Sequence, residues 1–249
     1  MKPLQFLATT TMLLSGAAHA TSVDSYAFGA NGYAADIAFN DRCNQGSSNV
    51  DCEFAVGELR YGNDALNGDR ELGINNPDDD SKPFTGAEGD FDWTSGQSYE
   101  FSFGYTAATQ LLSLTLDGTT IDTSSVSGGV DLAGAKSLFI RTRNKPGEDF
   151  TTLSDLELNG HAIPGAAVFD PSSVDVQYLQ VFGFDLADDW ELTGDITMTW
   201  DGTASGSNPA AQFKVTYVVP IPLPVGAWLM LTAVGGFGFA GWRRQCAAA

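Results

Sequence analysis

The stretch Trp190–Trp200, with the sequence WELTGDITMTW, decides the fold class. Its apolar side chains fall on every second residue, and glutamate, threonine and aspartate fill positions between them. Because neighbouring side chains of a strand point to opposite faces of a sheet, this period of two predicts a strand with one buried face and one solvated face.

A second stretch, residues 98–116, predicts a hairpin. Its apolar residues also alternate, with aromatic side chains first and leucines after them: Tyr99, Phe101, Phe103, Tyr105, Leu112, Leu114 and Leu116. A short loop at residues 107–109 separates the two parts, and Asp117-Gly118, a dipeptide typical of tight turns, follows the second part. We expect the aromatic stripes to form core rather than a ligand platform, because an alternating strand buries one face.

The same alternation predicts further strands at residues 138–143, 156–158, 178–184 and 213–217. Outside the two ends of the chain no window has a sustained 3.6-residue apolar period, and 28 glycines punctuate the sequence. We therefore expect an all-β fold, an antiparallel β-sandwich of jelly-roll or lectin-like type, with a closed barrel as the alternative.

Both ends of the chain carry export signals. Lys2, an apolar stretch and the small-x-small sequence Ala18-His19-Ala20 predict a signal peptide over residues 1–20, cleaved before Thr21, with an uncleaved N-terminal anchor as the alternative. Near the other end, the apolar run Val225–Trp242 forms a helix of about 27 Å, close to the ~30 Å of a bilayer's hydrocarbon core. Arg243 and Arg244 close the run and place the tail on the cytoplasmic side. Residues 21–218 are then one exported domain, and residues 219–249 are a C-terminal membrane segment.

Charge and cysteine content agree with export. The chain has 12 basic and 31 acidic residues and a net charge of −19, which would repel nucleic acid and anionic headgroups. Cys43 and Cys52 flank a short segment rich in Asn, Asp, Ser and Gly, where we expect a loop closed by a disulfide. Two unpaired thiols are the alternative, and Cys246 lies on the predicted cytoplasmic side.

The C-terminal segment resembles a known sorting signal. Ile221-Pro222-Leu223-Pro224-Val225, an apolar helix and an arginine cluster follow one another as in the VPLPA branch of the PEP-CTERM family, in which the motif reads Val-Pro-Leu-Pro-Ala. The resemblance implies recognition by an exosortase, a membrane-embedded transpeptidase or protease, and cleavage near the proline motif. It also implies a Gram-negative bacterium that makes exopolysaccharide, with the protein in its surface layer or biofilm matrix. An ordinary membrane anchor is the alternative.

The upstream domain is similar to the exported "choice-of-anchor" β-sandwich domains that carry such tails. The similarity lies in Phe91-Asp92-Trp93, residues 96–105 and the stretch Trp190–Trp200. It implies a β-sandwich ectodomain.

Catalytic and metal-binding patterns are sparse. His161 is the one histidine outside the signal peptide, in a segment that reads as a turn, and no Gly-x-Ser-x-Gly elbow accompanies it. The acidic residues 75–92 offer oxygen ligands for calcium, with Asp78, Asp80 and Asp90 as candidates, but their spacing is not that of an EF-hand. A solvated loop is the alternative. No catalytic residue or cofactor is expected.

The sequence therefore predicts a non-catalytic, exported cell-surface or matrix protein, held in the inner membrane by its C-terminal helix and then processed by an exosortase. A carbohydrate-binding module is one alternative, favoured if exposed rings such as Trp93 or Tyr61 line a groove. A glycoside hydrolase, which needs two carboxylates facing each other across a cleft, is the other.

Overall fold

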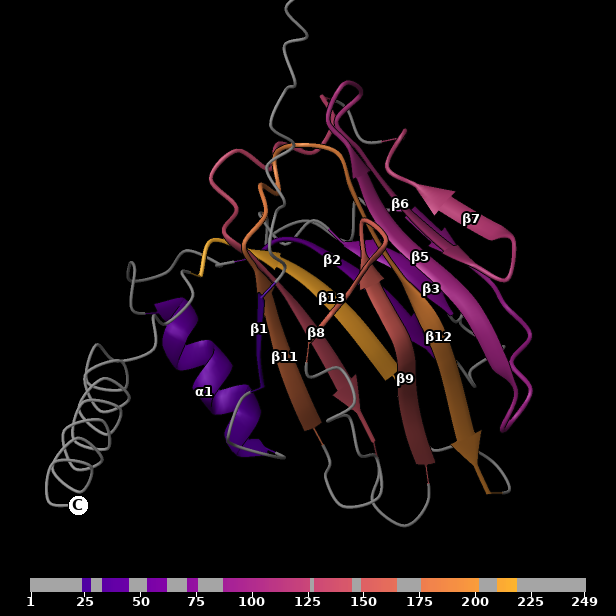
Figure 1. The fold of residues 1–249 in the computed structure, drawn as a ribbon. Helices are drawn as coiled ribbons and strands as arrows, with labels where there is room; N and C mark the ends of the chain where they lie inside the picture. Colours follow the sequence, from indigo (N-terminus) through magenta and orange to yellow (C-terminus); the bar gives the residue numbers. More distant parts are fainter. Residues whose placement is uncertain are drawn as a thin grey trace, which may run out of the picture.

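Two antiparallel β-sheets face each other in the computed structural model (Figure 1). The structure describes residues 24–27, 33–44, 53–61, 71–75, 87–125, 128–144, 149–164, 176–201 and 210–218. In spatial order, the seven-stranded sheet consists of β1 (Asp24–Ala27), β11 (Val176–Phe182), β8 (Ser137–Arg143), β13 (Ala210–Thr216), β2 (Glu53–Arg60), β3 (Leu72–Asn75) and β4 (Ala87–Gly89). The six-stranded sheet consists of β10 (His161–Ala162), β9 (Asp149–Leu158), β12 (Trp190–Trp200), β5 (Ser98–Thr106), β6 (Leu111–Leu116) and β7 (Thr119–Asp122).

The core lies between the sheets and is rich in aromatic rings. Phe101 of β5 stacks on Phe213 of β13 with ring centroids 4.9 Å apart, and Phe103 meets Trp190 edge to face at 5.3 Å. The four aromatic side chains of β5 are all buried, as the sequence predicts. Both sheets contribute to one hydrophobic cluster. The described strands thus form a sandwich, and the closed-barrel alternative is wrong.

The predicted hairpin is confirmed. β5 and β6 pair in register across a turn at residues 107–110, with Phe103 opposite Leu114. Asp117 and Gly118, at φ 45° and 82°, then lead into β7 through a tight turn that needs left-handed backbone at both positions. The alternation in Trp190–Trp200 corresponds to β12, which lies between β5 and β9.

The predicted absence of helices is wrong at one place. Helix α1 spans Tyr33–Asn44 and lies against the outer face of the seven-stranded sheet (Figure 1). The helix buries Ala35 and Phe39 against the sheet. Asp36 also points toward the sheet, where it meets Arg141, while Ile37 is 45% exposed. A charge on the inner face and an isoleucine on the outer face cancel the apolar period that would have revealed the helix.

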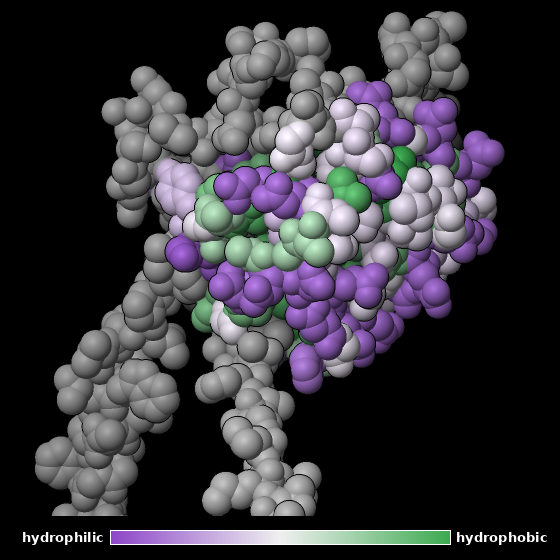
Figure 2. All heavy atoms as spheres, turned by 90° about the horizontal axis from the view of Figure 1, so that it is seen from above, coloured by the Kyte–Doolittle hydropathy of each residue, from purple (hydrophilic) through white to green (hydrophobic). Residues whose placement is uncertain are grey.

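The end of the sandwich seen from above is mostly hydrophilic over the described residues, with small apolar areas between polar ones (Figure 2). In the orientation of Figure 1 this is the upper end, where β5 meets β6 and where β13 ends. This end includes the points where the described chain enters β1 and leaves β13, which bears on how the domain is attached to a membrane.

Candidate functional site

The predicted sorting residues lie outside the described part of the chain. These are Pro222, Leu223, Pro224, Arg243 and Arg244, together with the apolar run 225–242 and the signal peptide 1–20. Among the described residues no helix is long and apolar enough to cross a membrane. The sorting signal, its helix and the boundaries of the exported domain remain predictions.

The predicted disulfide falls partly on described residues. Cys43 belongs to the last turn of α1, whereas Cys52 lies outside the described residues, directly before β2. The loop expected between the two cysteines also falls outside the described residues, apart from Asn44, and remains a prediction. Phe39 lies one helical turn before Cys43, and the Lys214 ammonium is 5.2 Å from the centre of its ring. The same ammonium is 2.6 Å from Oε1 of Glu53, the residue after Cys52. The described neighbours of the two cysteines are therefore joined through Lys214.

The calcium candidates are only partly visible. Asp78 and Asp80 lie outside the described residues, and Asp90 is exposed just after β4. Within the described ranges, no group of three or more His, Cys, Asp or Glu side chains is arranged to hold a metal ion. The proposed calcium loop remains a prediction.

The two candidate sugar-stacking rings are packed rather than free. Trp93 is half-buried, and its indole N–H donates to the carbonyl of Arg60 at 3.0 Å. Tyr61 is also half-buried, with its ring centroid 4.4 Å from that of Trp200. Together with Phe91, these rings extend the core at the lower end of the sandwich. We call Tyr61, Phe91, Trp93 and Trp200 the aromatic end.

His161 stands in an exposed position on β10, just after the turn formed by Asn159 and Gly160. The turn that the sequence indicates is therefore present, but the histidine itself begins the short edge strand. Its strand partner is Leu158. His161 does not line the depression described below.

The outer face of the six-stranded sheet is acidic. Its strands contain no lysine or arginine, whereas Arg60, Arg141, Arg143 and Lys214 all lie on strands of the seven-stranded sheet. A shallow depression of about 470 Å³ crosses β9, β12, β5 and β6. Carboxylates and hydroxyls line it: Glu100, Asp117, Asp155, Glu157, Asp195, Ser102, Thr115 and Thr193. Such a surface offers hydrogen-bond acceptors to a neutral or cationic ligand.

A β-bulge adds one of these carboxylates. The pairing of β9 with β12 shifts between Thr193 and Asp195, and Asp155 takes a left-handed backbone at φ 51°. Ser154 and Asp155 are consequently both exposed, while Leu156 returns to the core. Gly194 makes room for this arrangement, because a Cβ there would lie 2.6 Å from Cδ2 of Leu156 and 2.9 Å from the carbonyl oxygen of Ser154.

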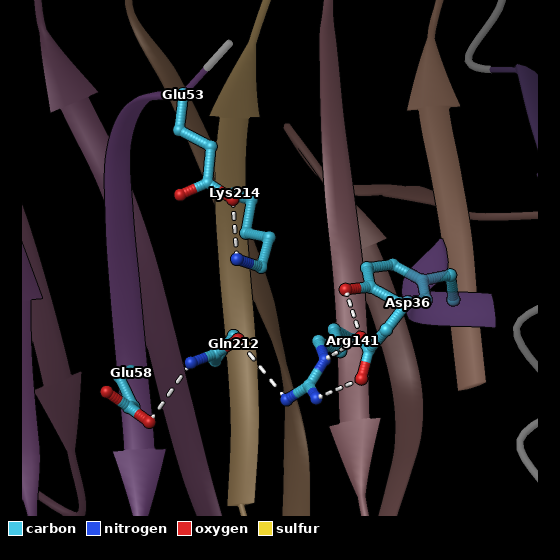
Figure 3. Close-up of polar contacts among 7 residues, drawn as sticks. Asp36, Glu53, Glu58, Arg141, Gln212 and Lys214 are labelled. Carbon is cyan, nitrogen blue, oxygen red and sulfur yellow. Dashed lines mark hydrogen bonds and ion pairs between the residues drawn. The ribbon is translucent and has the colours of Figure 1, made fainter. Parts of the chain in front are cut away.

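The outer face of the seven-stranded sheet carries a polar network under α1 (Figure 3). Arg141 donates from Nε and Nη2 to the two carboxylate oxygens of Asp36, each at 3.0 Å. Its Nη1 donates to Gln212 at 3.3 Å, and Gln212 donates to Glu58 at 3.1 Å. The Tyr178 hydroxyl donates to Asp36 at 2.8 Å. The network thus joins α1 to β8 and β11 and continues through Gln212 of β13 to Glu58 of β2.

This network shifts the acidity of its members. Burial raises the pKa of Asp36, but the hydrogen bond and charge of Arg141, the Tyr178 hydroxyl and the charge of Lys214 outweigh burial and leave that pKa below its ordinary value. Burial raises the pKa of Tyr178; the charge of Arg141 opposes the rise, and Asp36 adds to it. Asp36 therefore stays ionised and Tyr178 stays a neutral donor around pH 7. No local sequence pattern indicates these contacts, because they join residues 105 and 142 positions apart.

A second polar cluster is buried where the described chain ends. Ser137 donates to the carbonyl of Val218 at 2.7 Å and lies 3.1 Å from the Thr216 hydroxyl. Gln180 donates to Oγ of Ser137 at 3.1 Å. All four residues are at most 5% exposed. We call Ser137, Gln180, Thr216 and Val218 the exit cluster.

Comparison with known proteins identifies no relative. No protein family matches this chain, and no curated protein matches it. The function therefore has to be argued from the residues themselves.

Proposed function

We propose that this protein is a non-catalytic, exported cell-surface or biofilm-matrix protein whose C-terminal segment is processed by an exosortase. One observation carries the proposal: the proline motif at residues 221–225, the apolar run Val225–Trp242 and Arg243-Arg244 follow one another directly. They begin within a few residues of Val218, where the described sandwich ends. After processing, the domain is expected at the cell surface or outside the cell.

The ectodomain supports this role through its architecture. It is an antiparallel sandwich with a large buried core, which we assign to the jelly-roll or lectin-like type. Its six-stranded sheet presents hydroxyls and carboxylates to solvent. Such a surface keeps an exported module soluble at high local concentration, because like-charged copies repel one another.

The role of the motif is tested by replacing both of its prolines. In Pro222→Ala/Pro224→Ala, we expect the full-length chain to accumulate in the membrane fraction, because the apolar run is intact while the cleavage motif is lost. Pro164→Ala, in the ectodomain, is the matched control and should be processed normally. Normal processing of the double variant would refute a sorting role for the motif.

Carbohydrate binding in the acidic depression is the second candidate. The observation that favours it is the concave outer face of the six-stranded sheet, where carboxylates of Glu100, Glu157 and Asp195 lie among hydroxyl-bearing side chains. Carboxylates accept hydrogen bonds from sugar hydroxyls, and a shallow open surface suits a polymer.

Glu100→Gln/Asp195→Asn tests this candidate. The charge-matched control is Asp122→Asn/Asp188→Asn, which also removes two exposed carboxylates but outside the depression. Polysaccharide purified from the producing cells should be retained by the wild-type domain and the control but not by Glu100→Gln/Asp195→Asn. Equal retention of all three would reject the depression as a binding site. Release of new reducing ends from the polysaccharide would instead indicate the hydrolase alternative.

A further inference from the structure

The described chain enters and leaves the sandwich at the same end. β1 starts at Asp24, opposite Phe182 of β11, and β13 ends at Thr216, opposite Ser137 of β8. Because Val181 of β11 lies opposite Leu138 of β8, the next pair along these strands joins Phe182 and Ser137. Entry and exit therefore lie on one rung of the seven-stranded sheet.

One turn of the six-stranded sheet and two segments that connect the two sheets complete this end. Residues 183–189 connect the end of β11 to the start of β12, and Ala107 donates its backbone N–H to Asp189 at 2.7 Å. The segment 128–136 joins Gln110 through Val130 N–H, at 2.8 Å, and Thr216 through Lys136 N–H, at 2.7 Å. We call residues 107–110, 128–136 and 183–189 the exit rim. It forms the upper end in Figure 1 and faces the viewer in Figure 2.

The exit is held firmly. In the exit cluster, the Val218 carbonyl accepts hydrogen bonds from Ser137 and Gln180, and its N–H donates to Thr216 at 3.2 Å. The fold therefore controls the chain direction up to Val218. Because β13 is the central strand of its sheet, the chain leaves from the middle of the rim and not from a corner.

The link to the predicted membrane helix is short. From Val218 to Val225 a fully extended chain reaches at most about 25 Å. β12, at about 3.3 Å per residue, extends over roughly 30 Å from the rim toward the aromatic end. At the other terminus, the expected first mature residue, Thr21, precedes Asp24 by only about 10 Å of extended chain. During export the signal peptide and the C-terminal helix would both attach the chain to the membrane, and both short links start at the same rim. The rim therefore faces the bilayer.

The chemistry of the rim suits a surface that faces lipid without entering it. Its described residues include Asp131, Asp185, Asp188 and Asp189 but a single cation, Lys136. Carboxylates are repelled by the anionic headgroups of a bacterial membrane. Figure 2 shows apolar areas that are bordered by hydrophilic residues at this end of the described chain. The negative charge of the rim keeps it a short distance from the lipid headgroups. The proline motif between the rim and the membrane then stays accessible to a membrane-embedded protease.

We propose that the exit rim is the membrane-facing surface of the anchored protein, and that the aromatic end points away from the bilayer. The inference rests on the proposed anchoring by the C-terminal segment and adds an orientation to it. It follows that the aromatic end is the part of the anchored domain that projects farthest from the membrane.

The test uses the mature full chain, residues 21–249, reconstituted into vesicles of phosphatidylcholine and phosphatidylglycerol. A fluorescent amino acid replaces either Asp188 on the rim or Gln97 near the aromatic end, both exposed residues that lie between strands. Energy transfer to an acceptor on lipid headgroups is then measured. We expect transfer from position 188 to exceed that from position 97 by about twofold or more, because about 30 Å of strand separates them.

Vesicle flotation separates the two claims. The full chain should float with vesicles, and a chain ending at Val218 should not. A full chain that does not float would overturn both the anchoring and the orientation. A chain that floats but gives equal transfer from both positions, or more from position 97, would overturn the orientation and leave the anchoring intact.

Discussion

Arg141 on β8 donates two parallel hydrogen bonds, from Nε and Nη2, to the carboxylate of Asp36 in α1, and each is 3.0 Å long. The side chains are 11% and 26% exposed, so the pair is largely shielded from water. A planar guanidinium and a carboxylate match each other in this geometry, which makes the pair directional as well as strong. It is the main polar link between the helix and the sheet.

Breaking this pair from one side should destabilise the fold. Asp36→Asn and Arg141→Met each leave the other partner short of a charged hydrogen bond, at an expected cost of about 1–3 kcal/mol in the free energy of unfolding. The double variant should lose less than the sum of the two, which a urea-unfolding double-mutant cycle measures. If the losses of the two single variants add up to the loss of the double variant, Asp36 and Arg141 make no coupled contribution to the free energy of unfolding.

The same carboxylate predicts a pH dependence. The pKa of Asp36 lies below its ordinary value of 3.8, so the folded state holds the ionised form more tightly than the unfolded chain does. Its contribution is complete above about pH 4 and is lost as pH falls through the folded-state pKa. Urea unfolding of wild type and Asp36→Asn at about pH 6 and pH 3 should show a smaller difference in stability at the lower pH. A difference that grows on acidification would contradict the assigned sign.

The exit cluster should be sensitive to loss of one hydroxyl. Ser137→Ala removes the 2.7 Å donor to the Val218 carbonyl and the 3.1 Å acceptor for Gln180, and leaves the longer 3.4 Å bond from Gln180 to Val218 in their place. We expect a loss of about 1–3 kcal/mol, against less than about 0.5 kcal/mol for Ser98→Ala at an exposed strand end. Equal effects of the two changes would show that the cluster does not hold the exit.

Gly194 should tolerate no side chain. In Gly194→Ala the new Cβ would lie 2.9 Å from the carbonyl oxygen of Ser154, an atom that cannot move without breaking the β9–β12 pairing. Gly118→Ala places a Cβ in open space and is strained only by its φ of 82°. We expect the first change to cost more, by about 1–3 kcal/mol of overpacking, in thermal or urea unfolding. The reverse order would argue against the bulge at Asp155.

A disulfide between Cys43 and Cys52 is expected to bind the end of α1 to the start of β2. The unreduced protein should weigh two hydrogens less than the reduced one and show no free thiol at these positions after denaturation. Reduction should lower the stability by about 2–3 kcal/mol in the chain-entropy model. Two alkylatable thiols in the unreduced, denatured protein would rule out the bridge.

Sequence alternation revealed the strands whose two faces differ in burial. β5, β6 and β12 were clear because each buries one face between the sheets and exposes the other. β9 appeared only as residues 156–158 because the extra residue at Asp155 reverses the alternation halfway along it. β7 escaped notice because only Ile121 in it is even half-buried.

The polar features were harder to foresee than the core. The acidic depression arises because β9, β12, β5 and β6, distant in sequence, lie side by side, and the spatial order of strands cannot be derived from alternation. α1 was missed because Asp36 faces inward to meet Arg141 while Ile37 faces out. A local pattern contains no information about that distant partner.

The central claim is that the chain is exported, anchored and cut, and one measurement tests it most directly. The intact mass of the protein is determined separately from the membrane and extracellular fractions of the producing cells. We predict an extracellular form that begins at Thr21 and ends near Pro222–Pro224, and a membrane form that still contains Arg243. A single form in both fractions that retains residues 243–249 would contradict processing and leave an ordinary membrane anchor.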